Sequence, residues 1–512
     1  MEIIEPQTVV EDEEREMKSE SSLKSYWKAV NVEPVLFLSA MSNAMFLTLV
    51  PLFRYWARCI QLFEDFEQEN VTHFCRHLAE FPEAQNVVEI DLADWKVYLL
   101  MASTLPTVIT TPLIGVWSDR SVGRKLPLIL ALIAVNLSSM FDLVSTLTYK
   151  MITVYVGGMV SCIIQGISAC NLVIPATCYA IITDQCRDKD GATMSKRVGI
   201  LATTAAFGGL IGNALVWLTR TYVPTHSLAY FSCLFPSQIQ LILALLYTAF
   251  FVKETHHISA TVADRQQESQ SAGVWGIWYL LKKTVLEIVQ VLVKPRSGWT
   301  RCCLNLVMLS IVALVISLDT NNLLLFLKRA PFNWSDVRWS LFSILWSAVN
   351  VVGMAVVPAV IALTSIVGKD SFTILVALAT GVVQFLIYSF STQSWMIYST
   401  LLFAAFSAAL TPAYYAFMPK LVEQHETAQV YSVANLISNL VPVPAAQIFA
   451  VVYKATIDFW PGFAFFLCGV VLAIVLLIQL IVHLLMMATW KSDASDDAER
   501  IVDDTDEAAE IS

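Results

Sequence analysis

Long apolar stretches separated by short polar breaks fill the chain from about residue 33 to residue 488. A helix needs about 20 predominantly apolar residues to cross the hydrocarbon core of a bilayer. The pattern therefore predicts an all-α membrane protein with twelve spanning helices. The expected spans are 33–53, 95–115, 126–148, 152–182, 196–219, 227–252, 299–327, 337–366, 371–391, 393–417, 427–453 and 460–488.

Composition agrees with this pattern. Of the 512 residues, 56% are hydrophobic and only 14% are charged, whereas soluble domains carry about 25% charged residues. The mean hydropathy is +0.63. These values exclude a disordered protein, a secreted disulfide scaffold and an ordinary cytosolic enzyme. The first 30 residues are polar, so no cleavable signal peptide is visible, and the first span is expected to act as a signal anchor.

The positions of the loops predict two matched bundles. The expected order is a cytoplasmic tail over 1–32, a six-helix bundle over 33–252, a cytoplasmic linker over 253–298, a second six-helix bundle over 299–488 and an acidic cytoplasmic tail over 489–512. A long outer loop is expected over 54–94, inside the first bundle. Most Lys and Arg then fall on the cytoplasmic side, as the positive-inside rule requires. The net charge of −10 comes from the two acidic ends, which read as solvated and disordered tails, and no basic stripe suggests nucleic acid.

Two further features fit an outer face for the predicted loops. The sequons Asn70-Val71-Thr72 and Asn333-Trp334-Ser335 fall in segments assigned outside, so Asn70 and Asn333 are candidate glycosylation sites. Cys59 and Cys75 lie in the first outer loop, on the oxidising side, where they either pair or remain thiols.

The turn between the second and third spans carries a recognisable motif. It runs from Gly115 through Asp119 and Gly123 to Arg124 and Lys125. Glycines permit a tight turn, the aspartate can cap a helix or pair with a basic residue, and the two basic residues favour the cytoplasm. The motif resembles the loop of the major facilitator superfamily, with one extra residue before the second glycine. That resemblance implies a latch that holds the two halves in the outward-open state, although a plain charged turn would satisfy the same pattern.

Other patches resemble the proton-coupled folate transporter branch of that superfamily, solute carrier family 46. They are Trp117 to Lys125, Thr411-Pro412, Lys420 to Val422 and Tyr431 to Asn435. That branch carries functional ionisable residues in its fourth, fifth, seventh and tenth spans. At the aligned positions this chain has, in the same order, Cys170 or Asn171, Ala202, Ile316 and Tyr415. In that branch a disulfide joins the first outer loop to the loop after the seventh span, and the position of its cysteine in the later loop is occupied here by Asn333. Folate is therefore not the expected solute.

The resemblance implies that the first, fourth, seventh and tenth spans line a central cavity. Polar side chains within spans usually face such an interior. The candidates are amides and phenols with a single carboxylate, which suits a neutral or amphipathic organic solute. That carboxylate is Asp319. Like Asp142 in the third span, it either carries a proton during transport or has no such role. The candidate residues are Asn43, Gln165, Asn171, Asp319, Asn322, Tyr414 and Tyr415.

We therefore predict a secondary transporter of a small organic solute that works by alternating access, with protons as a candidate coupling ion. The alternative is a receptor or scaffold that keeps the fold without transporting. No metal-ligand cluster, nucleotide loop or catalytic constellation is visible in the sequence, so no enzyme activity and no cofactor are expected. The expected partners are the solute and the lipid bilayer, in a plasma or endolysosomal membrane.

Overall fold

The computed structural model describes residues 31–64, 71–118, 122–185, 191–223, 227–255, 293–296, 298–317, 323–364, 366, 368–423 and 426–510. Regular structure within these ranges is entirely helical. Eleven of the helical stretches found there are long and apolar enough to cross a membrane. The predicted all-α membrane fold is confirmed.

The first half of the chain forms one group of helices. They are α2 (Glu33–Phe63), α3 (Val71–Arg76), η1 (Leu78–Glu80), α4 (Pro82–Trp117), α5 (Lys125–Thr148), α6 (Val154–Ser168), α7 (Cys170–Gln185), α8 (Gly191–Tyr222) and α9 (Ser227–Phe251). Helices α6 and α7 share one span and meet at Ala169, whose φ of +48° places it in the left-handed region.

The second half forms another group. It contains α12 (Thr300–Ser317), α13 (Leu323–Lys328), α14 (Asp336–Ala362), α15 (Lys369–Phe390), α16 (Ser394–Ser407), α17 (Leu410–Phe417), η4 (Met418–Leu421), α18 (Thr427–Leu440), α19 (Pro442–Thr456) and α20 (Phe463–Glu510). The predicted span at 299–327 corresponds to α12 and α13, with residues 318–322 outside the described ranges.

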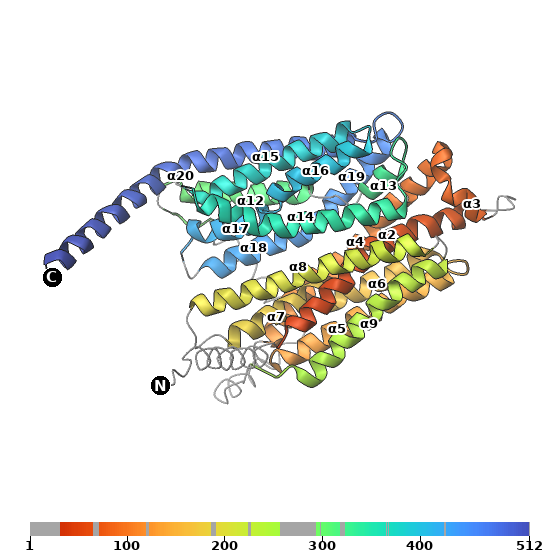
Figure 1. Cartoon of the computed structure of the whole chain (residues 1–512), viewed down its shortest axis with the longest axis horizontal. Helices are drawn as coiled ribbons and strands as arrows, with labels where there is room; N and C mark the ends of the chain where they lie inside the picture. Colours follow the sequence, from red (N-terminus) through yellow and green to blue (C-terminus); the bar gives the residue numbers. More distant parts are fainter. Residues whose placement is uncertain are drawn as a thin grey trace, which may run out of the picture.

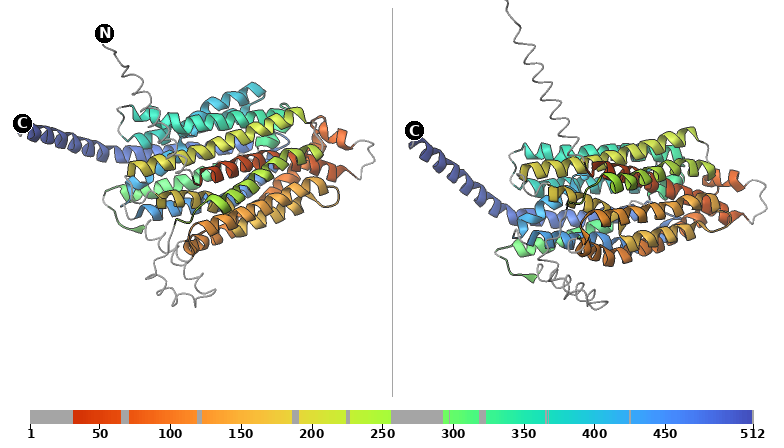
Figure 2. Two further views of the ribbon diagram at one scale, coloured as in Figure 1. Left: turned by 60° about the horizontal axis from the view of Figure 1, so that its bottom comes forward. Right: turned by 90° about the horizontal axis from the view of Figure 1, so that it is seen from below.

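The two groups lie side by side (Figure 1). Helix α8 packs against α14, and α4 packs against α19, so these four helices form the main contact between the halves, and α18 against α4 and α2 against α14 add smaller contacts. Helix α20 runs beyond the other helices in both views of Figure 2, and the segment predicted as a disordered acidic tail is helical through Glu510.

The long outer loop predicted over 54–94 is wrong in most of its length. Helix α2 continues to Phe63, and α4 begins at Pro82. The charged residues that suggested a loop are instead paired between helices: Arg58 Nε of α2 lies 2.7 Å from Asp91 Oδ2 of α4. Paired charges are tolerated on helices near a membrane, and the sequence alone does not reveal the pairing.

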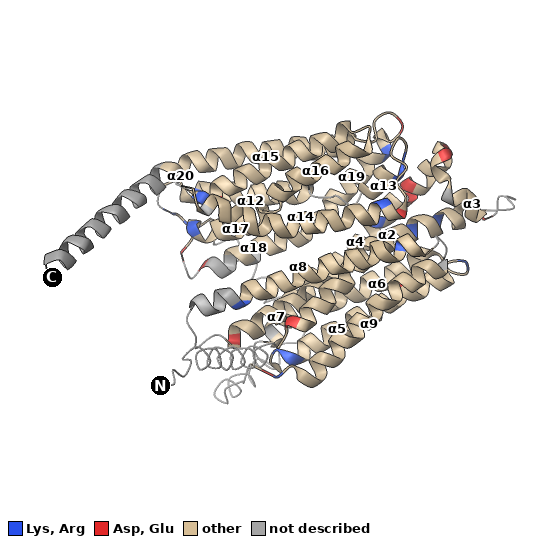
Figure 3. Ribbon diagram, in the orientation of Figure 1, with Lys and Arg blue, Asp and Glu red and all other residues tan. Residues whose placement is uncertain are grey.

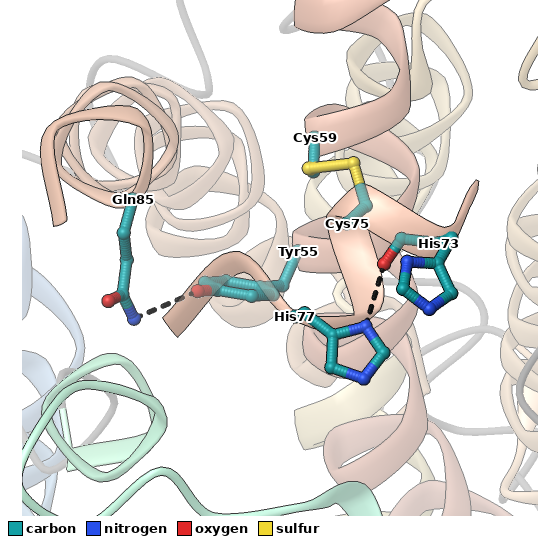
Figure 4. The surroundings of a disulfide bond; sticks show 6 residues. All are labelled: Tyr55, Cys59, His73, Cys75, His77 and Gln85. Carbon is teal, nitrogen blue, oxygen red and sulfur yellow. Dashed lines mark hydrogen bonds between the residues drawn. A yellow bond between two sulfur atoms is a disulfide. The ribbon is translucent and has the colours of Figure 1, made fainter. Parts of the chain in front are cut away.

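A disulfide joins Cys59 near the end of α2 to Cys75 of α3 (Figure 4). We call the end of the molecule that carries this bond the disulfide end. The opposite end carries Glu33, Arg124 and Lys294, and we call it the linker end.

Two glycines of α8 allow its backbone to contact α2 directly. A Cβ atom added at Gly208 would lie 2.5 Å from the carbonyl oxygen of Phe37, and one at Gly212 would lie 2.3 Å from that of Met41. At Gly209, the nearest atom is the Cβ of Ala44 at 4.0 Å. The three glycines are close in sequence, yet only two of them face the neighbouring backbone.

We expect Gly212→Ala to lower the thermal midpoint of the detergent-purified protein, measured by size-exclusion chromatography after heating. Overpacking of this kind costs about 1–3 kcal/mol. Gly209→Ala is the matched control, because its methyl group enters ordinary contact distance, and its midpoint should equal that of the native chain. Equal midpoints for both variants would contradict the close approach of α2 and α8.

Candidate solute cavity

A cavity of about 880 Å³ lies between the two halves. The first half contributes residues of α2, α4, α6 and α8, and the second half contributes residues of α12, α13, α14, α17, α18 and α19. Most of the wall is apolar or aromatic, and Tyr155, Trp339, Phe342 and Trp346 supply ring surfaces. This volume and lining are typical of a pocket for a drug-sized organic molecule.

A hydrogen-bonded bridge crosses this cavity from one half to the other. The Thr48 hydroxyl of α2 donates to Asn213 Oδ1 of α8 at 2.7 Å, and Asn213 Nδ2 donates to the Ser347 hydroxyl of α14 at 2.7 Å. These polar groups therefore satisfy one another and leave the remaining wall free for apolar contact.

The charged residues among those that line the cavity are both basic: Arg54 of α2 and Lys96 of α4. Arg54 Nη2 lies 3.1 Å from Asp142 Oδ1 of α5, behind the wall. The guanidinium lies against Gly158 of α6, where an added Cβ would be 2.7 Å from Nη2. The side of the ion pair that reaches the cavity is therefore the positive one.

Among the seven residues predicted for the cavity, Tyr414 and Tyr415 belong to its wall. Asn43 is exposed and lies one turn from Leu47, which is a wall residue, on the same side of α2. Gln165 Nε2 donates to the Ser138 hydroxyl at 2.7 Å, and Asn171 Nδ2 donates to Gln165 Oε1 at 3.0 Å, so the two amides bond to one another, and neither is among the residues that line the cavity. Asp319 and Asn322 lie outside the described residues.

Arg54 and Lys96 are wall residues that the sequence-based prediction does not include. Arg54 falls in the predicted outer loop, and Lys96 falls at the start of the predicted second span. The helical spacing contains the missing signal, because the wall residues of α2 and of α4 recur at intervals of three and four. On α2 these are Leu47, Pro51 and Arg54, and on α4 they are Leu92, Lys96, Leu99 and Ser103.

Ion pairs and hydrogen bonds connect the two halves at the disulfide end. Asp336, at the start of α14, accepts from Arg220 Nη2 of α8 at 2.5 Å and from the Tyr230 hydroxyl of α9 at 2.6 Å. Lys454 of α19 pairs with Asp94 of α4. Figure 3 shows charged residues of both signs gathered where α2, α4 and α14 meet at this end.

Glu89 of α4 adds a further connection between the halves. It is fully buried, and its Oε2 accepts from the Tyr453 hydroxyl of α19 at 2.9 Å and lies 3.4 Å from Arg329 Nη1. One turn of α4 away, Gln85 Nε2 donates to the Lys328 carbonyl oxygen at 3.2 Å. The contact between the halves is therefore polar and extensive at the disulfide end.

At the linker end, each of the ion pairs seen among the described residues joins two segments of the same half. Arg197–Glu33 and Arg124–Asp184 join helices of the first half, whereas Lys420–Asp370 and Arg296–Glu426 join segments of the second. Burial raises the pKa of the Glu426 carboxyl, but hydrogen bonds from Lys294 and Arg296 outweigh burial and lower this pKa to about 2. Glu426 is therefore ionised at any physiological pH.

The motif predicted to form a latch surrounds a carboxylate. Glu254 accepts from the backbone N–H groups of Arg124 at 2.8 Å and Lys125 at 2.9 Å, at the N-terminus of α5. Gly123 has a φ of +81°, and an added Cβ would lie 2.5 Å from this carboxyl group, so glycine is required there. By contrast, a Cβ at Gly115 meets nothing within 4 Å, and Asp119 lies outside the described residues.

The structure describes one of the two candidate glycosylation sites. Asn333 is exposed and adopts a φ of +49°, close to the disulfide end of α14. Asn70 lies outside the described residues. Within the described ranges, no group of three or more His, Cys, Asp or Glu residues is placed to hold a metal ion.

Comparison with known proteins identifies the relatives of this chain. It is 24% identical to the class E tetracycline resistance protein of Escherichia coli over 403 residues, 78% of this chain and 88% of the relative. It is 24% identical to the rat proton-coupled folate transporter over 74% of this chain and 76% of the relative. It is 20% identical to a chicken lysosomal proton-coupled steroid conjugate and bile acid symporter over 86% of this chain and 91% of the relative.

The fold has solved counterparts. The xylose transporter XylE of E. coli, in an inward-open conformation, superposes with a TM-score of 0.59 at 14% identity, covering 88% of this chain and 95% of XylE. The resemblance to the folate transporter branch is confirmed, and the chain is an integral membrane protein whose relatives are transporters rather than enzymes. Since the family model matches residues 32–446, the chain belongs to the Major Facilitator Superfamily.

Proposed function

We propose that this protein is a secondary active transporter of an amphipathic organic anion and that it works by alternating access. The observation that carries the proposal is the pair of basic side chains, Arg54 and Lys96, in a wall that is otherwise uncharged and mostly apolar or aromatic. An anionic group would be attracted to these cations, while the rest of the solute would contact the rings of Trp339 and Trp346. The sequence suits a neutral or an amphipathic solute, and the two basic wall residues favour an amphipathic solute that carries an anionic group.

The pattern of ion pairs supports an inward-facing state. The halves are tied together at the disulfide end, whereas Arg197–Glu33 and Arg296–Glu426 at the linker end each lie within one half. We place the linker end in the cytoplasm, together with both termini, because Arg124 and Lys125 lie there. The cross-half contacts of Asp94, Glu89 and Asp336 then form a closed outer gate.

The same orientation gives roles to the remaining predicted residues. The turn with Gly115, Asp119, Gly123, Arg124 and Lys125 would face the cytoplasm, where it is released from the second half in this state and latches in the outward-open state. Asn70 and Asn333 would face the outside and carry glycans. A relative named as lysosomal supports a lysosomal membrane, and a plasma membrane is the alternative.

The first test uses purified protein in liposomes and four labelled solutes: a folate, a taurine-conjugated bile acid, a steroid sulfate and xylose. We expect saturable uptake of at least one of the three anions and none of xylose. Lys96→Gln should reduce uptake of that anion by about tenfold, because a hydrogen bond to a charged group contributes about 1.5–3 kcal/mol.

Lys150→Gln is the matched control, since Lys150 is an exposed lysine outside the cavity wall, and it should leave uptake unchanged. Uptake of none of the three anions, or equal uptake of xylose, would refute the proposed function.

A second test addresses the outer gate. Asp94 and Lys454 form an ion pair between α4 and α19, so cysteines at both positions should be bridged by a bifunctional methanethiosulfonate reagent whose spacer replaces the length of the lysine side chain. We expect the cross-linked double variant to lose uptake and to regain it after reduction, because the gate can open only when the halves separate. Each single cysteine variant, treated identically, controls for effects on the native disulfide, and full uptake by the cross-linked protein would exclude a moving gate here.

A further inference from the structure

Asp142 is a buried carboxylate directly behind the cavity wall. It lies on α5, and its two oxygens have different partners: Oδ1 faces Arg54 Nη2 at 3.1 Å, and Oδ2 accepts from the Ser161 hydroxyl of α6 at 2.7 Å. The Arg54 side chain is 19% exposed and that of Asp142 is 10% exposed. Arg54 therefore bridges the cavity and the buried carboxylate.

Among the described residues, Arg54 is the one group of opposite charge around Asp142. Helix α2 presents Arg54, and α6 presents Ser161 and Cys162. Helix α9 contributes Cys233, which packs in the same cluster as Leu143. Helix α7 packs on α5 through the cluster of Leu128 and Leu132, nearer the linker end.

A solute anion that binds Arg54 from the cavity would compete with Asp142 for the guanidinium. The existing pair is poorly suited to resist this competition, because Arg54 makes one contact of 3.1 Å with Asp142. One turn away on α2, Arg58 contacts both oxygens of Asp91 at 2.7 and 3.3 Å, and the Tyr155 hydroxyl donates to the same carboxylate at 2.6 Å. Of the two arginines, Arg54 is the one that lines the cavity.

Building on the proposed function, we propose that Asp142 is the proton acceptor of this transporter, and that it takes up one proton when the solute anion replaces it at Arg54. Before binding, the site holds one positive and one negative charge. Afterwards the positive charge of Arg54 is matched by the solute anion, and Asp142 is a neutral acid. Charge is conserved with one anion and one proton entering together, so no unpaired charge remains in the membrane interior.

This balance matters because an uncompensated buried charge is strongly unfavourable. If the anion entered alone, Asp142 would lose its counter-ion and remain ionised among apolar helices. If the proton entered alone, Arg54 would lose its partner. Binding of the anion lowers the free-energy cost of protonating Asp142, and protonation of Asp142 lowers the free-energy cost of binding the anion. The two events are therefore thermodynamically coupled.

The surroundings of Asp142 accommodate either protonation state. The Ser161 hydroxyl lies 2.8 Å from that of Ser138, and Gln165 Nε2 donates to Ser138 at 2.7 Å and to Ser161 at 3.2 Å. When Asp142 is ionised, Ser161 donates to it. When Asp142 is protonated, its own O–H can donate to Ser161, which turns its hydrogen to Ser138. The hydroxyl groups rotate, and the hydrogen bond between Asp142 and Ser161 is kept in both protonation states.

The test uses liposomes loaded with the purified protein and a labelled taurine-conjugated bile acid, whose sulfonate stays ionised throughout the pH range used. For the native protein, a gradient of one pH unit should support about tenfold accumulation, as expected for one proton per anion. Asp142→Asn should abolish this accumulation and retain exchange of internal for external bile acid within about twofold, because an amide mimics the protonated acid but cannot release a proton.

Asp91→Asn is the matched control, since it alters an arginine–aspartate pair outside the cavity wall, and it should retain the accumulation driven by the pH gradient. A second measurement does not depend on any variant: addition of the bile acid to the native protein in weakly buffered detergent should cause uptake of about one proton per bound anion, detected with a pH indicator dye.

The outcomes separate the two proposals. If Asp142→Asn still accumulates bile acid in response to the gradient, or if the native protein binds it without taking up protons, Asp142 is not the coupling site, although the protein still transports an anion. If none of the three anions is taken up by the native protein, the proposed function fails, and this inference fails with it.

Discussion

Buried charges must be compensated inside a bundle of apolar helices, and this constraint determines how the two halves meet. Apolar helix surfaces have little preference for one partner over another within a bilayer. Ion pairs are specific, because a charge that loses its partner in this environment is costly. Here Asp336, Glu89 and Asp94 each have a partner in the opposite half, and Asp336 also pairs with Lys328 of its own half, whereas Glu33 and Glu426 pair within their own half. The choice of partner therefore defines which end is closed.

The same constraint reveals a symmetry between the halves. Glu33 at the start of the first span pairs with Arg197 of α8, which forms the fifth. Arg296, just before α12 of the seventh, pairs with Glu426, just before α18 of the eleventh. The two pairs occupy corresponding places with their charges exchanged. Electrostatic attraction is unchanged by that exchange, so the arrangement persists without any matching residues, and direct comparison of the two half-sequences does not detect it.

Hydrophobic run length predicts the spans well, because burying a helix in a bilayer depends on composition over about 20 residues rather than on particular neighbours. It fails at 54–94, where Arg58 and Asp91 look solvated in sequence but neutralise each other between α2 and α4. The cavity is predicted less completely for the same reason. Tyr414 and Tyr415 line it, while Gln165 and Asn171 bond to each other and are not among the lining residues. No single-sequence signal separates amides that bind a solute from amides that join helices.

Helix α2 fixes the position of Arg54, and the way it is held determines which parts can move. Its backbone lies directly against Gly208 and Gly212 of α8, and its arginine lies against Gly158 of α6. Side chains cannot slide through such contacts, because the atoms already touch at backbone distance. Helices α2, α6 and α8 should therefore move together, and α5, which carries Asp142, packs on α6. Arg54 and Asp142 would then stay within reach of each other throughout the proposed transport cycle. The wall opposite Arg54 comes from the second half, so in that cycle its movement would open Arg54 to one side of the membrane and then to the other.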